Sequence, residues 1–210
     1  MQRGATRKQH WEHVYRSTDP SQVGWYRPHL ETSFQWITEL SLAREARIID
    51  VGTGASSLPE DLLREGYRNL TLMDLSEAAL RTLESRIGTP AEDVIFVHGD
   101  VASTVFPPAY HDLWHDRAVF HFLVSPQQRQ RYRENLIQTL KPGGYALIAT
   151  FTPEAPPKCS GLPVERYTAE GLRMHFEPEL SLVKQQTELH VTPTGVEQPY
   201  VYALFRKPAR

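Results

Sequence analysis

The chain is poor in cysteine, in net charge and in long apolar runs, and each shortage excludes a class of protein. Its 210 residues include one cysteine, Cys159, so no disulfide forms within the chain, and this usage fits a reducing compartment. A formal net charge of -2 gives no general attraction to nucleic acid or anionic lipid. No apolar stretch reaches membrane-spanning length, and residues 1–10 are too polar for a secretory signal. We therefore expect a cytoplasmic protein that binds neither nucleic acid nor membrane.

Length and composition indicate one globular domain. Hydrophobic residues make up 40% and charged residues 23%, and 210 residues suffice for one α/β domain with a full core. We expect a single domain over residues 1–210, made of an N-terminal helical segment, residues 1–45, and an α/β core, residues 46–210. A short basic arm opens the chain, and we expect its side chains to be solvated: Arg3, Arg7, Lys8 and His10.

Short apolar runs alternate with amphipathic segments from Arg47 onward. The amphipathic segments have helix signals: Ser76 is a good N-cap, and Ser125-Pro126 opens a helix that ends before Lys141-Pro142-Gly143-Gly144. Alternating strands and helices imply parallel crossovers and hence a doubly wound sheet. The apolar runs predict strands buried on both faces, at residues 47–51, 69–73, 93–98, 111–115 and 144–151.

The two ends of the chain depart from this alternation. Strand-like segments at 180–191 and 198–206 are separated by six residues only, too few for a parallel crossover, so they predict an antiparallel hairpin. The expected fold class is therefore α/β, a mostly parallel seven-stranded sheet with a C-terminal hairpin. Before residue 47, helices near 9–16 and 29–42 carry many aromatic residues, which form either an extra core layer or a cover over a ligand crevice: Trp11, Tyr15, Trp25, Tyr26, Phe34 and Trp36.

The most informative stretch is Ile48-Ile49-Asp50-Val51-Gly52-Thr53-Gly54. A buried strand ends here in an acid and then in two glycines one residue apart. Glycine adopts positive φ and has no Cβ, so a ligand can touch the backbone at such a turn. The acid suits a cationic or hydroxyl-bearing ligand better than a bare phosphate.

Two more acids follow the next strands, where ligands bind in open α/β sheets. Asp74 lies 20 residues past the glycine loop, where an acid accepts hydrogen bonds from ribose hydroxyls. Asp100 is placed to accept from an exocyclic adenine amine. Asp50 is placed to orient the glycine loop or to meet an ammonium group.

At these residues the chain resembles the class I methyltransferases that use S-adenosylmethionine, and the post-helix turn 140–144 and the terminal hairpin extend the likeness. The resemblance implies the α/β methyltransferase fold and this cofactor, while Ser56-Ser57 stand where a further glycine is common and indicate altered helix packing. A nicotinamide-binding domain is the rival, but it prefers Gly-x-Gly-x-x-Gly without Asp50. The residues expected to bind the cofactor are Asp50, Gly52, Thr53, Gly54, Asp74, Leu75, Asp100, Val101 and His115.

Catalytic candidates lie just beyond the fourth strand, in residues 112–123. His115 or His121 can take a proton near neutral pH, Asp116 can orient the imidazole, and Arg117 can hold an anion. The structural alternative is an Asp116–Arg117 ion pair that locks the loop, with His121 as a helix cap. His111 and His115 have same-face strand spacing, but nothing completes a ligand set, so we expect no metal site.

Substrate contacts are expected from two segments. The loop 157–167 follows the fifth strand and carries Cys159 and Tyr167, although a lone cysteine is most often a small buried hydrophobe. The second segment is the aromatic N-terminus, which would be a lid unless it is plain core packing: Trp11, Tyr15, Trp25 and Tyr26.

Residues 11–15, 114–123 and 158–167 together are similar to a bacterial branch of these enzymes near the thiopurine- and thiol-methylating group, and more loosely to a mitochondrial protein-lysine methyltransferase group. A compact chain without an added substrate domain favours a small acceptor. The expected acceptor is a small soft nucleophile such as a thiol, a sulfide or a related chalcogen, used by a monomer or homodimer. Protein lysine methylation is the alternative, and a non-catalytic cofactor-binding partner subunit is a third.

Overall fold

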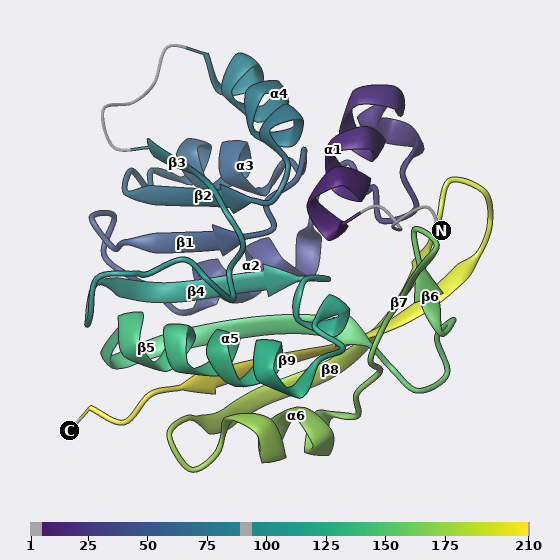
Figure 1. The fold of residues 1–210 in the computed structure, drawn as a ribbon. Helices are drawn as coiled ribbons and strands as arrows, with labels where there is room; N and C mark the ends of the chain where they lie inside the picture. The colour runs from purple at the N-terminus through teal and green to yellow at the C-terminus, as the bar shows by residue number, and fades with distance from the viewer. Residues whose placement is uncertain (1–5, 89–93, 210) are drawn as a thin grey trace.

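A central sheet divides the protein into three layers (Figure 1). The computed structural model describes residues 6–88 and 94–209. The sheet has seven strands in the order β3-β2-β1-β4-β5-β9-β8, of which β9 and β8 are antiparallel to their neighbours. The strands are β1 (Ile48–Val51), β2 (Leu70–Asp74), β3 (Val94–His98), β4 (His111–Arg117), β5 (Leu140–Phe151), β8 (Ser181–Val191) and β9 (Glu197–Arg206). The predicted α/β class with a C-terminal hairpin is confirmed.

Helices cover both faces of this sheet, as Figure 1 shows. One core contains side chains of α2 and α3 packed on β1 and β2, and the other contains side chains of α5 and α6 packed on β4, β5 and β9. A further helix, α1, contacts α4 beside the carboxyl ends of the parallel strands. The helices are α1 (Arg7–Ser17), α2 (Glu31–Glu39), α3 (Leu58–Glu65), α4 (Glu77–Ile87), α5 (Pro126–Thr139) and α6 (Ala169–Phe176), with 3-10 turns η1 (Pro20–Gln22) and η2 (Phe120–Phe122).

Local signals set several of these boundaries. Ser76 caps α4 by accepting from the backbone N–H of Ala79, and Pro126 begins α5, where its missing N–H leaves no bond unmade. The predicted strand at 144–151 begins earlier, at Leu140, because the chain pairs with β4 on both sides of a register shift. Among the elements that were not predicted are α3, α6 and a small hairpin of β6 (Lys158–Cys159) and β7 (Leu162–Pro163), which replaces the expected loop around Cys159.

The aromatic residues of the N-terminal segment lie in two different places. Trp36 on α2 is 2% exposed and belongs to the core beneath the sheet. Trp11, Tyr15 and Trp25 instead lie at the carboxyl ends of the parallel strands. In the part of the chain that the structure describes, no helix has the length and apolar character needed to cross a membrane.

Candidate active site

The glycine loop leaves β1 at the edge where the parallel strands end. Gly52 and Gly54 have φ of 66° and 54°, in the left-handed region that favours glycine. A Cβ on Gly52 would lie 2.0 Å from Val119 Cγ2, and one on Gly54 would lie 2.4 Å from the Tyr15 hydroxyl. The loop is therefore packed between the segment after β4 and the N-terminal helix, with no room for a side chain.

Asp74 ends β2 beside this loop and is buried. Its Oδ2 accepts from the Gly54 N–H at 2.9 Å, and its Oδ1 accepts from the Ser76 N–H at 2.8 Å. Burial raises the pKa of Asp74 to about 6, although these two hydrogen bonds oppose the shift. Each carboxylate oxygen keeps a further lone pair, so the group can accept additional hydrogen bonds from a ligand.

Asp50 and His115 form a buried pair across neighbouring strands. Asp50 Oδ1 lies 2.6 Å from His115 Nδ1, and His115 Nε2 lies 2.9 Å from the Ser33 hydroxyl on α2. Both ring nitrogens therefore have partners inside the fold, an arrangement that positions the ring. The other carboxylate oxygen, Asp50 Oδ2, is buried without a hydrogen-bond partner.

Asp100 follows β3 and is held from both sides. Its Oδ1 accepts from the Ala102 N–H, and its Oδ2 accepts from Arg7 at 2.9 Å. Arg7 also donates to the Phe122 carbonyl at 3.3 Å. The expectation that the basic arm is solvated is thus wrong for Arg7, which joins α1 to Asp100. It is also wrong for His10, whose Nε2 lies 3.1 Å from the Ser160 hydroxyl, whereas Lys8 is exposed and Arg3 lies outside the described residues.

α1 is attached to the core at a second point that the sequence did not indicate. Glu12 Oε2 accepts from the Ser76 hydroxyl at 2.8 Å and from the Ala78 N–H at 3.2 Å. This carboxylate therefore caps the N-terminus of α4, where the helix dipole favours negative charge.

A cavity lies between α1 and the strand ends. A second, smaller hollow adjoins it on the other side of Gly52, and both are bounded by Tyr15, Trp25 and Arg117. Of the expected site residues, the cavity is lined by Trp11, Tyr15, Trp25, Gly52, Asp74, Leu75, Asp100, Val101, Arg117 and Cys159. The second hollow adds Tyr26, Asp50, Thr53, Gly54 and His115.

Three expected site residues lie outside both linings: Asp116, His121 and Tyr167. Asp116 accepts from the Tyr132 hydroxyl at 2.6 Å and from the Val119 N–H, and burial raises its pKa to about 6. It does not pair with Arg117, which bonds to Tyr202 and Trp25 instead, because successive side chains of a strand point to opposite faces, so the alternative ion pair is wrong. Asp116 fixes the turn after β4 and does not face the cavity.

His121 and Tyr167 are buried in the surrounding core. His121 Nδ1 accepts from the Phe151 N–H at 3.3 Å, and burial, followed by the charge of Arg117, lowers its pKa to about 3. His121 therefore does not cap a helix, contrary to the structural alternative. Tyr167 packs on Phe120, with ring centres 5.2 Å apart, and burial raises its pKa to about 12.

Cys159 is buried in the core and also borders the cavity. It is 3% exposed and belongs to a core cluster, as a small buried hydrophobe does, yet it also lines the cavity. Burial raises the pKa of its thiol to about 12, so the group is not a ready nucleophile.

Aromatic rings from the N-terminal segment form one wall of the cavity. Trp11 and Trp25 meet edge to face at 5.3 Å, Tyr15 lies 6.1 Å from Trp25, and Trp11 lies 5.0 Å from Phe122 of η2. Their mutual contacts hold the rings in place over the strand ends. Val119 and Phe122, which sequence reasoning left without a role, belong to the same lining.

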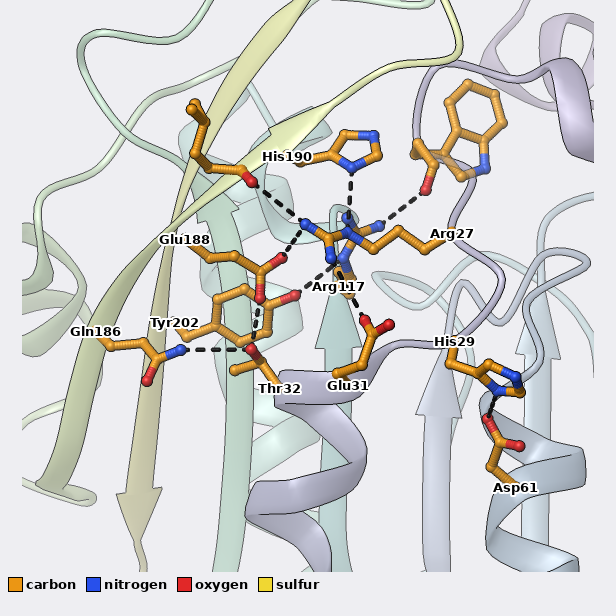
Figure 2. A network of polar contacts seen from close by, with 12 residues as sticks. Arg27, His29, Glu31, Thr32, Asp61, Arg117, Gln186, Glu188, His190 and Tyr202 are labelled. Carbon is orange, nitrogen blue, oxygen red and sulfur yellow. Dashed lines mark hydrogen bonds and ion pairs between the residues drawn. The ribbon is translucent and has the colours of Figure 1, made fainter.

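Arg117 ends β4 at the junction of the two hollows. It donates from Nε to the Tyr202 hydroxyl at 3.0 Å and from Nη1 to the Trp25 carbonyl at 3.1 Å. Figure 2 shows it beside a polar network in which Arg27 reaches Glu188 and the Leu189 carbonyl of β8. This network joins the N-terminal segment to the C-terminal hairpin.

Comparison with known proteins identifies the chemistry of this edge. Residues 48–144, which contain the glycine loop and all three acids, match a family model described as a methyltransferase domain. The match identifies a methyltransferase domain in this part of the chain. One similar solved structure comes from work on the conversion of a disulfide bond into a thioacetal group during echinomycin biosynthesis. It has a TM-score of 0.77 at 17% identity, and the alignment covers 98% of the present chain and 94% of that structure's chain.

Other similar proteins act on different acceptors. EEF1A lysine methyltransferase 2 of Danio rerio is 23% identical over 95% of this chain and 86% of its own length. Malonyl-[acyl-carrier protein] O-methyltransferase of Haemophilus ducreyi is 33% identical, but over 51% of this chain and 41% of its own. A Burkholderia thailandensis 1,6-didemethyltoxoflavin-N1-methyltransferase, solved with S-adenosylhomocysteine, has a TM-score of 0.70 at 21% identity, with 94% and 84% covered.

The residues at the strand ends fit the cofactor. Two carboxylates with free lone pairs, Asp74 and Asp100, line the cavity, and Asp50, whose Oδ2 has no partner, lines the adjoining hollow. Across residues 6–88 and 94–209, no cluster of at least three histidine, cysteine or acidic side chains is placed to hold a metal ion. His111 is instead bonded to the Thr139 hydroxyl at 2.8 Å.

Proposed function

We propose that the cavity holds the adenosine part of S-adenosylmethionine and that the adjoining hollow holds its methionine part. Asp74 would accept from the ribose hydroxyls, and Asp100 from the adenine amine between Leu75 and Val101. Asp50, with its unpartnered Oδ2, would meet the ammonium group. The glycine loop, Gly52, Thr53 and Gly54, would lie against the ligand between these acids. His115 would act by holding Asp50.

When bound, the cofactor supplies a methyl group on a positively charged sulfur. The donor is already activated, so the chain contributes position and a dry environment. Residues 1–45 would act as a lid, since α1 is fastened to Asp100 through Arg7 and to α4 through Glu12.

We propose that the acceptor is a small soft nucleophile, such as a thiol, a sulfide or a related chalcogen species. The observation that carries this proposal is the aromatic wall of Trp11, Tyr15 and Trp25, which lines the same cavity as Cys159 at the strand ends. A wall of this kind removes water from a sulfur nucleophile, and loss of its hydration raises its reactivity toward a sulfonium.

Lysine methylation of a protein is a second candidate. The Danio rerio relative, whose name states this activity, aligns over nearly the whole of the present chain. A lysine side chain would enter the same aromatic-walled space and present its neutral amine as the methyl acceptor. The third reading, a partner subunit that binds the cofactor without turnover, predicts donor binding and no methylated product.

Methyl-labelled S-adenosylmethionine distinguishes the three. The enzyme is supplied with sulfide or methanethiol, and volatile products are measured in the headspace; in parallel it is supplied with a cell extract that is separated by size. The proposal predicts label in methanethiol or dimethyl sulfide. Label only in macromolecules would replace it with lysine methylation, and donor binding with no label in either arm would favour the partner subunit.

A further inference from the structure

Arg117 is a buried positive charge without a carboxylate. Its side chain is 9% exposed, and within residues 6–88 and 94–209 no acid lies within ion-pair distance of it. The carboxylates of the neighbouring network, Glu31 and Glu188, both pair with Arg27 (Figure 2). A guanidinium stays charged at every relevant pH, and a buried charge is costly unless it is paired.

The hydrogen-bond donors of Arg117 are only partly used. Nε and Nη1 donate to Tyr202 and to the Trp25 carbonyl, and the guanidinium lies over the Tyr200 ring at 4.6 Å. Nη2 is buried and has no partner. Since Arg117 lines both the cavity and the adjoining hollow, this unused nitrogen belongs to a side chain of the cavity wall.

A second unused donor lies in the same cluster. The Arg117 guanidinium lies over the Tyr200 ring, and the Tyr200 ring packs on Phe151 with ring centres 4.9 Å apart. The Phe151 ring packs in turn on the His121 ring, with centres 4.7 Å apart. The Phe151 N–H can only donate, so His121 Nδ1 is an acceptor and the neutral ring carries its proton on Nε2. His121 Nε2 is also buried without a partner. Each is a buried donor without a protein acceptor, and of the two residues Arg117 is the one that lines the cavity.

We infer that Arg117 holds the methyl acceptor as an anion, through a carboxylate that the acceptor carries. This inference rests on the proposed function for the place of the acceptor and adds its charge. A guanidinium binds an anionic oxygen through charge-assisted hydrogen bonds.

Three thiols of matched size separate charge from shape: 3-mercaptopropionate, 3-mercapto-1-propanol and 3-aminopropane-1-thiol. Each is titrated into the complex of the protein with S-adenosylhomocysteine, and quenching of Trp11 and Trp25 fluorescence reports binding. A charge-assisted contact predicts about tenfold or greater preference for the anionic thiol over the neutral one. The cationic thiol should bind weakest. Equal affinities for the three, or the reverse order, would overturn the inference.

Variants assign the preference to Arg117. Arg117→Gln should bring the anionic and neutral thiols to similar affinity, whereas Arg117→Lys should keep part of the difference because it keeps the charge. Arg81→Gln, on the exposed side of α4, removes the same charge elsewhere and should leave the order unchanged. An unchanged preference in a folded Arg117→Gln protein would overturn the assignment.

The titration does not depend on turnover, so its failure and that of the proposed function are distinguishable. If the protein prefers the anionic thiol in the titration but methylates no thiol, the anion site stands and the proposed thiol acceptor is rejected. If the protein methylates a thiol but binds the three probe thiols without a preference for the anion, the proposed acceptor stands and the anion site is rejected. If Arg117→Gln does not fold, the order of the three thiols on the wild-type protein still decides.

Discussion

The Asp50 carboxylate lies 2.6 Å from His115 Nδ1, and the two residues are register partners on the paired strands β1 and β4. Both are buried, and Ser33 of α2 takes the other ring nitrogen. The pair therefore joins the cofactor edge of the sheet to the N-terminal segment. We expect His115 to act on Asp50 and not on the acceptor.

This arrangement predicts that His115→Ala lowers the free energy of unfolding by about 1–3 kcal/mol, because it leaves buried polar groups without partners. Donor affinity should fall with it, since Asp50 loses its support. Chemical denaturation and calorimetric titration with S-adenosylhomocysteine measure the two effects. Unchanged stability and donor affinity with a reduced kcat would instead make His115 a base.

The glycine loop predicts a sharp steric effect. Gly52→Ala places a methyl 2.0 Å from Val119 Cγ2 at positive φ, so it should cost more than about 2 kcal/mol of stability and most of the donor affinity. Gly195→Ala is the matched control, because Gly195 also has positive φ but nothing lies within 4 Å of its added Cβ. Equal effects of the two substitutions would show that the close approach to Val119 is unimportant.

Glu12 predicts how firmly the lid is held. Glu12→Ala removes the carboxylate that caps α4. The free energy that holds α1 against the core should therefore fall by about 1 kcal/mol. Opening should become more frequent, so S-adenosylhomocysteine should dissociate several-fold faster in stopped-flow measurements. Glu84→Ala, farther along α4 and not engaged by α1, is the control. A dissociation rate that does not respond to Glu12→Ala would mean that α1 does not gate the cavity.

Asp116 predicts a pH dependence of stability. Its pKa is about 6 in the folded protein against 3.8 as the ordinary value, so the folded state binds the extra proton between about pH 4 and pH 6. Stability should therefore fall as pH rises through this window, by an amount on the order of 3 kcal/mol for this group. Asp74, with a pKa raised to about 6, acts in the same direction.

The measurement is the free energy of unfolding at pH 4 and pH 7, compared between wild type and Asp116→Asn. The asparagine cannot titrate, so the fall from pH 4 to pH 7 should be smaller in the variant. An identical pH response in both proteins would place the buried proton elsewhere.

Much of the site was predictable because parallel strands end at one edge of a sheet. Asp50, Asp74 and Asp100 each follow an apolar run, and the alternation of elements was enough to bring them together. The terminal hairpin was predictable from the short link 192–197, which excludes a crossover. These conclusions depend on local pattern and chain connectivity alone.

The remainder depends on contacts between distant segments. Nothing near Arg7 in the sequence signals its partner Asp100, and Ser33 gives no hint of His115. Asp116 and Arg117 are a different case: they were expected to act side by side, but the two-residue period of a strand separates them to opposite faces. That period was readable from the sequence.

Calorimetric titration of wild type and Asp74→Ala with S-adenosylhomocysteine tests the central claim most directly. The account predicts that wild type binds this ligand, that NADH gives no heat of binding, and that Asp74→Ala weakens the affinity by about 10–100-fold through lost ribose hydrogen bonds. Binding of NADH but not S-adenosylhomocysteine, or undiminished affinity in a folded Asp74→Ala protein, would contradict it.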